Sequence, residues 1–538
     1  EQPFRLDSGE PDGRYRYYTE AKFDYVRKFG DDHTVTGLLM YYQQQRQRIF
    51  KYDTTNAKVA IPFRNLGVSG RVTYGFRDKY LLDLNFGYNG SENFQPGDQF
   101  GFFPAVSAGW VLSEESFIKD NFWWVNMFKI RYSYGIVGED KLTSDETDYS
   151  KRIAYTYLIE GSDGYTFGEY NTNKINGYRI TGFGSPGLTW EKAQKHNLGI
   201  DMVFWDNKIS FTTDIFKDHR TDIFMQRGNM PFSTGLQDKI SETWANIGEM
   251  ESYGIEGVAS YSDKIGAVSY TIRGNFTYQN TNVIEHDEAD NALYYQMTRG
   301  YRLNQTRGYI DLGLFKDEED IANSPSQIAL GNVMPGDIKY KDVNGDGIID
   351  NKDEVPIGHT TVPSFVYGAG LNLQWRDFDF GMLFQGAGLV DFFIGGTSIH
   401  LFSGEKTGNI LEYMTDPKDR WISREISGTA DTENVNATIP RLSYGSNSNN
   451  YRPSTYWLRD GRYLRLKNVE FGYNLPKKWT SALSATNMRL GFIGTNLLVF
   501  SPFNWWDPEI GNRGGAYYKD GAKYPISKTF SLNFTINF

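Results

Sequence analysis

The sequence predicts an all-β fold, a transmembrane antiparallel up-and-down β-barrel with long extracellular loops and short periplasmic turns. Three observations predict it: alternating apolar and polar residues in many segments, a contrast between short and long connections, and a high aromatic content. The 538 residues include 37 Tyr, 37 Phe and 56 Gly, and 16% of them are aromatic. This composition suits strands anchored by aromatic side chains better than an average soluble enzyme.

Charge and cysteine content exclude other classes of protein. The chain has no Cys, which excludes a disulfide framework and cysteine-based metal or redox sites. Its net charge of -10 argues against nucleic acid as a partner. The chain also lacks the run of about 20 apolar residues that a transmembrane helix needs. Because Glu1–Arg5 does not resemble a signal peptide, we expect a removed signal or a start inside a larger protein.

Alternation is clearest in the last ten residues, 529–538. The odd-numbered side chains there are all polar, and the even-numbered ones are Phe530, Leu532, Phe534, Ile536 and Phe538. Similar alternation occurs in 82–88, 130–136, 197–204 and 268–278. In an outer-membrane barrel the apolar set faces lipid, whereas in a soluble sandwich it faces a core. The strands alone leave both folds open, so the connections must decide between them.

The connections between these segments fall into two length classes. One class is short, at 30–32, 76–79, 205–208, 263–266 and 375–377. The other class is long, at 139–186, 280–363 and 391–455. Alternation of short periplasmic turns with long extracellular loops is typical of membrane barrels. Loops of this length are unusual in a soluble sandwich, so the connections favour the barrel.

The strand count predicts a barrel that is incomplete by itself. We expect about 15 strands and a short helix within 113–126. The strands are expected to start near 15, 33, 67, 79, 104, 128, 189, 208, 251, 267, 364, 378, 462, 486 and 528. Single-chain bacterial barrels have even strand numbers, and an open sheet edge in lipid is not viable. The remaining strands are therefore expected from another polypeptide or from another part of this one. The strand directions also predict that residue 1 lies in an extracellular loop.

The strongest local motif is the acidic run from Asp342 to Asp353, within the segment 335–358. Its spacing matches a calcium loop, in which positions 1, 3, 5, 7, 9 and 12 supply oxygen ligands and a glycine permits a sharp turn. The predicted metal ligands are Asp342, Asn344, Asp346, the backbone carbonyl of Ile348, Asp350 and Asp353. Asp at the last position resembles the dockerin-type loop. Because Pro356 follows closely, we expect a structural calcium in an extracellular loop; the alternative is a solvated cluster of Asx turns.

Signals of catalysis are weak. The chain has no G-x-S-x-G, no H-E-x-x-H and no phosphate-binding P-loop, so we predict that it is not an enzyme. A Ser–His pair assembled across strands stays open, but no residue pattern favours it. Trp505 and Trp506 are candidate substrate-binding residues because exposed aromatic rings stack on sugars or grip peptides. The alternative is that both belong to an aromatic girdle at the membrane interface.

Several longer motifs resemble SusC/RagA-type TonB-dependent transporters. They extend over nearly the whole chain, at 101–110, 113–117, 129–138, 335–340, 463–476 and 507–511, together with the terminal Phe538. The resemblance implies a barrel of about 22 strands from Bacteroidetes, in which residues 1–538 form the C-terminal portion. The plug domain, the TonB box and about seven early strands would then lie outside this chain.

The resemblance also implies a function and partners. Such proteins import glycan oligomers or peptides across the bacterial outer membrane, with energy from TonB and a SusD-like surface lipoprotein as a lid. The expected partners are these two proteins, the polypeptide that holds the plug and early strands, and outer-membrane lipid. Inward polar residues such as Arg131, Asp201 and Arg273 would line the lumen or contact the plug. The alternatives are a siderophore or cobalamin receptor and an outer-membrane enzyme or adhesin barrel; the sequence does not choose between glycan and peptide.

Overall fold

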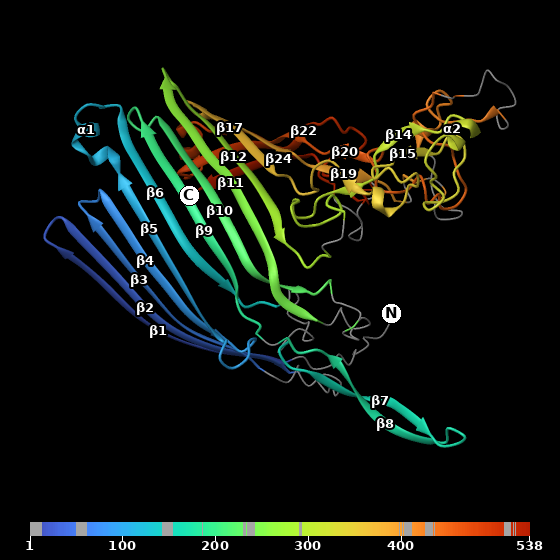
Figure 1. Ribbon diagram of the computed structural model, residues 1–538. Coiled ribbons are helices and arrows are strands. Elements are labelled where there is room, and N and C mark those ends of the chain that lie inside the picture. The colour runs from blue at the N-terminus through green and yellow to red at the C-terminus, as the bar shows by residue number, and fades with distance from the viewer. Residues whose placement is uncertain are drawn as a thin grey trace, which may run out of the picture. The chain divides into compact units, whose positions relative to one another are not determined.

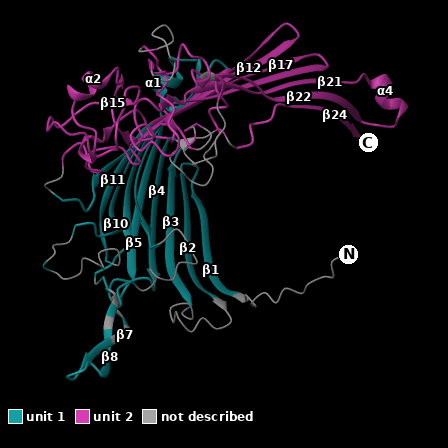
Figure 2. Ribbon diagram, turned by 90° about the vertical axis from the view of Figure 1, so that its right-hand side faces the viewer, with its two compact units in different colours: residues 1–206, 212–254, 281–290 teal, residues 207–211, 255–280, 291–538 magenta. Residues whose placement is uncertain are grey.

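The structure is a computed structural model that divides into two compact units. Unit 1 comprises residues 1–206, 212–254 and 281–290, and unit 2 comprises 207–211, 255–280 and 291–538 (Figure 2). The structure describes residues 13–49, 62–142, 154–185, 187–229, 233, 243–289, 293–396, 399–400, 402, 411–424, 434, 436–510, 518–519, 521 and 523–538.

Fifteen long strands form one sheet, and each is hydrogen-bonded to the next long strand in the chain (Figure 1). They are β1 (Gly13–Phe29), β2 (His33–Ile49), β3 (Phe63–Phe76), β4 (Tyr80–Ser91), β5 (Phe100–Val111), β6 (Val125–Glu139), β9 (Glu191–Phe204), β10 (Ile209–Gln226), β11 (Trp244–Ile265), β12 (Val268–Glu285), β17 (Phe365–Trp375), β18 (Phe378–Gly388), β21 (Tyr463–Asn474), β22 (Asn487–Phe500) and β24 (Thr529–Asn537). The predicted number of strands is confirmed. Only β11 starts well before its predicted position, because backbone pairing continues beyond its alternating segment.

Along β4, exposed apolar side chains alternate with less exposed polar ones, as expected for a membrane strand. On β4, Leu82, Leu84 and Phe86 are 37%, 48% and 38% exposed, whereas the polar residues between them are partly buried. On β24, the last strand of the sheet, Phe530, Leu532 and Phe534 are more than half exposed, and most of its polar residues are exposed as well. A soluble sheet would expose its polar face and bury its apolar one, so this sheet presents its apolar face to an apolar surrounding.

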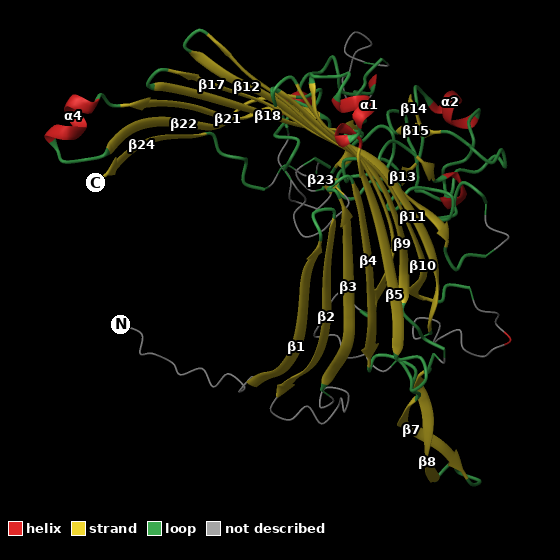
Figure 3. Cartoon of the chain, turned by 90° about the vertical axis from the view of Figure 1, so that its left-hand side faces the viewer, coloured by secondary structure: helices red, strands yellow, loops and turns green. Residues whose placement is uncertain are grey.

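Within each unit the short turns and the long connections lie at opposite ends of the strands. In unit 1, α1 (Ser116–Lys119) follows the one-turn helix η2 (Leu112–Glu114) at one end, and the hairpin of β7 (Leu158–Phe167) and β8 (Asn173–Gly182) lies at the other (Figure 3). The helix predicted within 113–126 is thus confirmed, although it is shorter because β6 begins at Val125. In the tight turn before β4, Arg77 and Asp78 have φ of 52° and 54°, a left-handed backbone conformation that residues other than glycine rarely adopt.

The hairpin β7–β8 was not expected from the sequence, which predicted one long loop at 139–186. Its large side chains do not contribute to a core: Tyr165 is 71% exposed and Tyr178 is 83% exposed. A two-stranded hairpin without a packed face has no regular alternation of buried and exposed residues. The sequence signal that identified the long strands was therefore missing here.

The two long connections at 280–363 and 391–455 do not form open loops in unit 2. Short elements within them pair as β13 (Arg307–Gly308) with β16 (Val355–Pro356) and β14 (Asp311–Leu314) with β15 (Ile338–Tyr340). A third element, β19 (Asp391–Ile394), pairs with two strands that follow later in the chain, β20 (Leu458–Asp460) and β23 (Tyr518–Lys519). Three short helices accompany them: α2 (Glu318–Ala322), η6 (Asn351–Asp353) and η7 (Glu412–Met414). A further helix among the described residues, α4 (Lys477–Ala482), joins β21 to β22 and lies near the chain's C-terminus (Figure 3).

These elements enclose a hydrophobic cluster, here termed the loop core. Its buried members are Tyr309, Leu330, Ile338, Tyr340, Ile349, Val355, Ile357, Phe392, Phe393, Ile394, Ile399, Trp457 and Phe503. The connections of unit 2 thus form an ordered layer with its own apolar interior, beyond the strand ends. Among the described residues, no helix is long and apolar enough to cross a membrane.

Candidate functional site

A buried carboxylate, Asp337, ties the two long connections of unit 2 together. It is fully buried just before β15, and its oxygens accept hydrogen bonds from side-chain amides of Asn447 and Asn450 at 3.1 and 2.9 Å. The Arg441 guanidinium approaches it with Nε at 2.8 Å and Nη2 at 3.1 Å. A buried charge is tolerated only when it is paired and hydrogen-bonded, and these donors meet that requirement. Asp337 therefore holds residues 441–450 against the start of β15.

Two neighbouring buried amides extend this network. Gln327 donates to Asn449 at 2.7 Å and accepts the backbone N–H of Tyr340 at 2.7 Å. Asn450 accepts the backbone N–H of Ile338 at 2.8 Å. The sequence contained a signal for this network, because 335–340 is one of the family-like motifs, but its partners lie roughly a hundred residues away and no local pattern identifies them.

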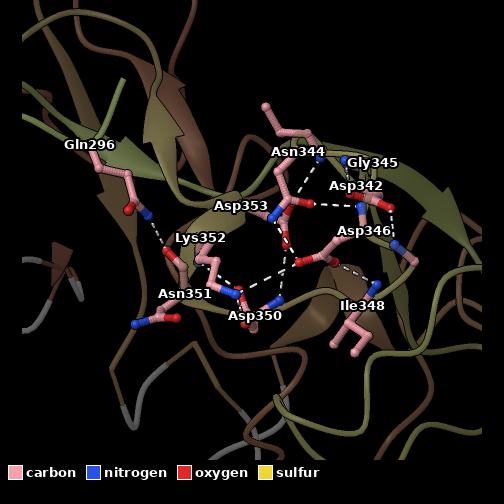
Figure 4. A network of polar contacts seen from close by, with 12 residues as sticks. Gln296, Asp342, Asn344, Gly345, Asp346, Ile348, Asp350, Asn351, Lys352 and Asp353 are labelled. Atoms are coloured by element: carbon pink, nitrogen blue, oxygen red, sulfur yellow. Dashed lines mark hydrogen bonds and ion pairs between the residues drawn. The ribbon is translucent and has the colours of Figure 1, made fainter. Parts of the chain in front are cut away.

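The predicted calcium loop is brought together as one compact turn (Figure 4). Asp342 accepts the backbone N–H groups of Gly345 and Gly347 at 2.7 and 2.8 Å, and the two glycines have φ of 76° and 82°. A second turn forms where Asp346 accepts from the Ile348 N–H at 2.9 Å. These bonds curl the first half of the loop around its own backbone, and Gly347 has the role in the turn that the sequence predicted for the glycine at the sixth position.

The last predicted ligand closes the loop. Asp353 is fully buried, and its oxygens accept the backbone N–H groups of Val343 at 2.8 Å and Asp350 at 3.0 Å. Asp350 in turn caps the short helix η6 through the N–H of Lys352 at 2.7 Å. The two ends of the predicted loop are therefore held together by the carboxylate that the spacing placed at its last position.

The donor chemistry of this loop fits calcium, whereas the side chains are not arranged around one point. The predicted ligands offer carboxylate, amide and carbonyl oxygens, which hard cations prefer. Within the described ranges, no three His, Cys, Asp or Glu side chains converge as a metal-binding group. The Lys352 ammonium instead lies 3.8 Å from Asp346 and 3.7 Å from Asp350. Calcium binding thus stays a prediction, and the Lys352 ammonium would compete with the ion for Asp346 and Asp350.

Local hydrogen bonds favour the charged form of one loop carboxyl, that of Asp346. The backbone N–H of Ile348, followed by the Asn344 side chain, holds the pKa of the Asp346 carboxyl below its usual value. Burial, followed by the Asp353 carboxylate, raises the pKa of the nearby Tyr295 phenol. The charged form of the Asp346 carboxyl and the neutral form of the Tyr295 phenol are therefore favoured.

The predicted substrate residues lie beside a buried arginine. Trp505 is 39% exposed, and the Arg459 guanidinium lies 5.7 Å from its ring centroid; Trp506 is half-buried and packs on the loop core. Arg465 of β21 is 1% exposed and anchors this segment, with Nη2 at 2.6 Å from both Asp507 and Glu509. The two tryptophans are neighbours with ring centroids 6.0 Å apart, and Trp505 is the more exposed of the two. Their role in substrate binding stays a prediction.

The polar face of unit 1 carries ion pairs. Arg131 of β6 contacts Asp201 on β9 at 3.1 Å and Asp214 on β10 at 2.6 Å. Its side chain is one-third exposed, so the charges remain hydrated. Arg131 and Asp201 thus lie on the polar face, as predicted, and they bind each other across neighbouring strands.

Comparison with known proteins identifies the family. The family model described as TonB dependent receptor-like, beta-barrel matches residues 2–497. The chain belongs to this family. Proteins of this family are outer-membrane receptors and transporters, which is not an enzyme class, and the resemblance of this chain to SusC/RagA-type proteins is confirmed.

Individual relatives agree with the family assignment. The TonB-dependent receptor P3 of Formosa agariphila is 26% identical over 497 residues, covering 88% of this chain and 45% of the relative. The TonB-dependent receptor SusC of Bacteroides thetaiotaomicron is 23% identical over 499 residues, covering 89% and 44%. The solved RagAB peptide transporter matches 98% of this chain and 55% of its own with a TM-score of 0.70 at 17% identity, which shows a shared fold. The chain spans about half the length of these relatives.

Membership in an outer-membrane family gives the exposed apolar row of β4 a direct test. We expect Leu84→Arg to destabilise the folded protein by about 2–4 kcal/mol, because it places a charge in hydrocarbon near the middle of a strand. The measurement is urea unfolding of the outer-membrane protein in lipid vesicles. The matched control is Ser107→Arg, since Ser107 lies on the polar face opposite Asp83 in the β4–β5 register. Equal unfolding midpoints for the two variants would contradict a lipid-facing Leu84.

Proposed function

We propose that this chain is part of a TonB-dependent importer of oligomeric nutrients, glycan oligosaccharides or peptides, that works with a SusD-like surface lipoprotein. The observation that supports the proposal is the loop core of unit 2 in a chain of this family. Two connections of great length fold there into an ordered layer at the strand ends, with the exposed ring of Trp505 at its surface. A receptor for an oligomer needs a large, preorganised surface outside the barrel, because binding energy falls with every side chain that must be ordered.

The test is an uptake assay with a deletion strain and its complemented counterpart. The strains receive a panel of labelled oligosaccharides and peptides, each with and without a functional TonB. We expect at least one oligomer whose uptake requires both this protein and TonB, and co-purification of a lipid-anchored surface protein. If only ferric siderophores or cobalamin enter through the protein, the nutrient-importer proposal is wrong and the alternative receptor class is correct.

We also propose that the loop Asp342–Asp353 binds calcium as a structural ion. The ion would be held by Asp342, Asn344, Asp346, the Ile348 carbonyl, Asp350 and Asp353. Its positive charge would fasten the first half of the loop to the end that contains η6. Loops of extracellular modules bind calcium with dissociation constants on the order of 0.1–1 mM, so millimolar calcium is the appropriate probe.

Removal of calcium is expected to loosen this segment. We expect EDTA to increase the rate of protease cleavage within 335–358 in the membrane-embedded protein, and millimolar calcium to restore protection. Asp342→Ala should abolish the restoration because a carboxylate ligand is lost. Lys352→Gln should strengthen it, because the ammonium that lies 3.7–3.8 Å from Asp350 and Asp346 is removed. Cleavage rates that ignore calcium in both the parent protein and Lys352→Gln would show that the loop is an Asx-turn cluster without metal.

A further inference from the structure

Unit 2 contains a pocket at the edge of the loop layer that the sequence did not predict. Its volume is about 690 Å³, within the range of known ligand sites. Four separate segments form its wall: 316–318 at the start of α2, 334–335 before β15, 420–424, and 441–442. Only long-range packing brings them together, so the pocket is a product of the folded loop layer.

Cations outnumber carboxylates in the wall of this pocket. Lys316, Arg420 and Arg424 contribute positive charges, against the carboxylates of Asp317 and Glu318, whereas the charge of Arg441 is already paired with Asp337. Asp317 is also engaged as the N-cap of α2, where its side chain accepts the Asp320 N–H at 2.8 Å. Its charge is thereby partly directed at the backbone of its own helix. The remaining balance favours an anionic ligand.

The arginine at the base of the pocket is held in place. Arg441 reaches the buried Asp337 with two of its nitrogens, so its guanidinium has little freedom to rotate. A fixed guanidinium binds a carboxylate with a smaller loss of side-chain entropy than a flexible lysine does. The same buried carboxylate that joins the two connections thus also orients one wall of the pocket.

The aromatic residue of the lining offers no open ring face. Trp421 is 4% exposed, and the backbone of Gly336, at φ 87°, packs directly against its indole, where a Cβ would collide with the ring. Among the described residues its indole N–H has no acceptor. Sugar rings are commonly bound by stacking on open aromatic faces, and this lining provides none. Its apolar part is instead aliphatic and consists of Met334, Pro335, Ile422 and Leu442.

We propose that this pocket binds an acidic oligopeptide, with side-chain or terminal carboxylates on Arg420 and Arg424 and apolar side chains against Met334 and Leu442. Guanidinium groups match carboxylates in a planar, two-bonded geometry, and aliphatic walls suit peptide side chains. The proposal rests on the proposed import function, since it names the class of oligomer that the protein receives outside the barrel. An acidic oligosaccharide shares the charge but lacks the apolar groups for the aliphatic wall.

The test is binding to the complete protein purified from outer membranes, measured by fluorescence anisotropy. The probe is a labelled hexapeptide with alternating Glu and Leu; the comparison ligands are the same peptide with Gln for Glu and an oligogalacturonate of equal charge. We expect the acidic peptide to bind most tightly and to weaken with salt. The double variant Arg420→Gln/Arg424→Gln should lose at least about tenfold in affinity, the effect of one charged hydrogen-bonded pair. Lys341→Gln removes an exposed cation outside the pocket and should bind as the parent does.

Each contrary outcome has a definite meaning. Equal binding of the Gln peptide, or undiminished binding by the double variant, would overturn the pocket assignment. Tighter binding of oligogalacturonate that also requires Arg420 and Arg424 would overturn the peptide class. Because the assay uses purified protein, its failure leaves TonB-dependent uptake intact, whereas failure of the uptake assay leaves the binding result intact. Unchanged electrophoretic heat-modifiability of the variants shows that they are folded.

Discussion

Asp337→Ala is expected to destabilise the loop layer of unit 2 by about 3–5 kcal/mol, because it leaves a partly buried arginine and two buried amides without their shared acceptor. Asp337 is fully buried and lies within 2.8–3.1 Å of donors on Arg441, Asn447 and Asn450. The carboxylate also accepts the backbone N–H of Met334 at 2.8 Å, so the turn before β15 loses a bond as well. No other side chain in the described network meets so many donors from two distant segments.

Hydrogen exchange and limited proteolysis of the membrane-embedded protein measure this effect. Protection should fall in 327–340 and 441–450 together, while the long strands keep theirs. Asp337→Asn is the conservative variant, and we expect a smaller loss because its amide oxygen still accepts two of the bonds. Asp460→Asn is the matched control because its ion pair with Arg462 is exposed. The side chains of Asp460 and Arg462 are 43% and 66% accessible, and such pairs contribute at most about 1 kcal/mol. Protection that is unchanged in Asp337→Ala would show that the two connections are held by the loop core alone.

Arg465→Met is expected to release the segment 501–510 from β21. The guanidinium is 1% exposed and lies 2.6 Å from both Asp507 and Glu509, whose carboxylates would remain partly buried without a cation. Removing one partner of a buried ion pair costs about 3–5 kcal/mol, and here two carboxylates lose their partner. The phenol of Tyr463 donates to Glu509 at 2.7 Å, but a neutral donor does not replace the charge.

The loss should appear as faster hydrogen exchange in 501–510 and easier proteolysis next to Trp505 and Trp506. Arg465→Lys keeps the charge and should recover part of the protection, because an ammonium cannot form the same paired geometry. The double variant Arg465→Met/Asp507→Leu should be more stable than Arg465→Met alone, since one of the abandoned charges is removed. If the single and double variants behave alike, the arginine acts through packing and not through charge.

The sequence was sufficient for the long strands and their turns. Alternation with a period of two is a local property, and lipid enforces it on every spanning strand, so segments such as 82–88 and 529–538 could be assigned without any partner. It failed at β7–β8, whose described large side chains are exposed, so that no packed face enforces the alternation there. The calcium-like loop was equally readable, because its turns are made by residues within a dozen positions of one another.

The tertiary structure alone decided how the long connections are organised. Asp337 meets Arg441 and Asn450, and the pocket joins 316–318 to 420–424, across separations of about a hundred residues for which no periodic pattern exists. The sequence by itself therefore determined the membrane sheet, its polar face and the acidic loop, because neighbouring residues and a uniform lipid environment specify them. The loop core, its buried polar network and the cationic pocket depend on which distant side chains fill the same space, and only packing in three dimensions settles that.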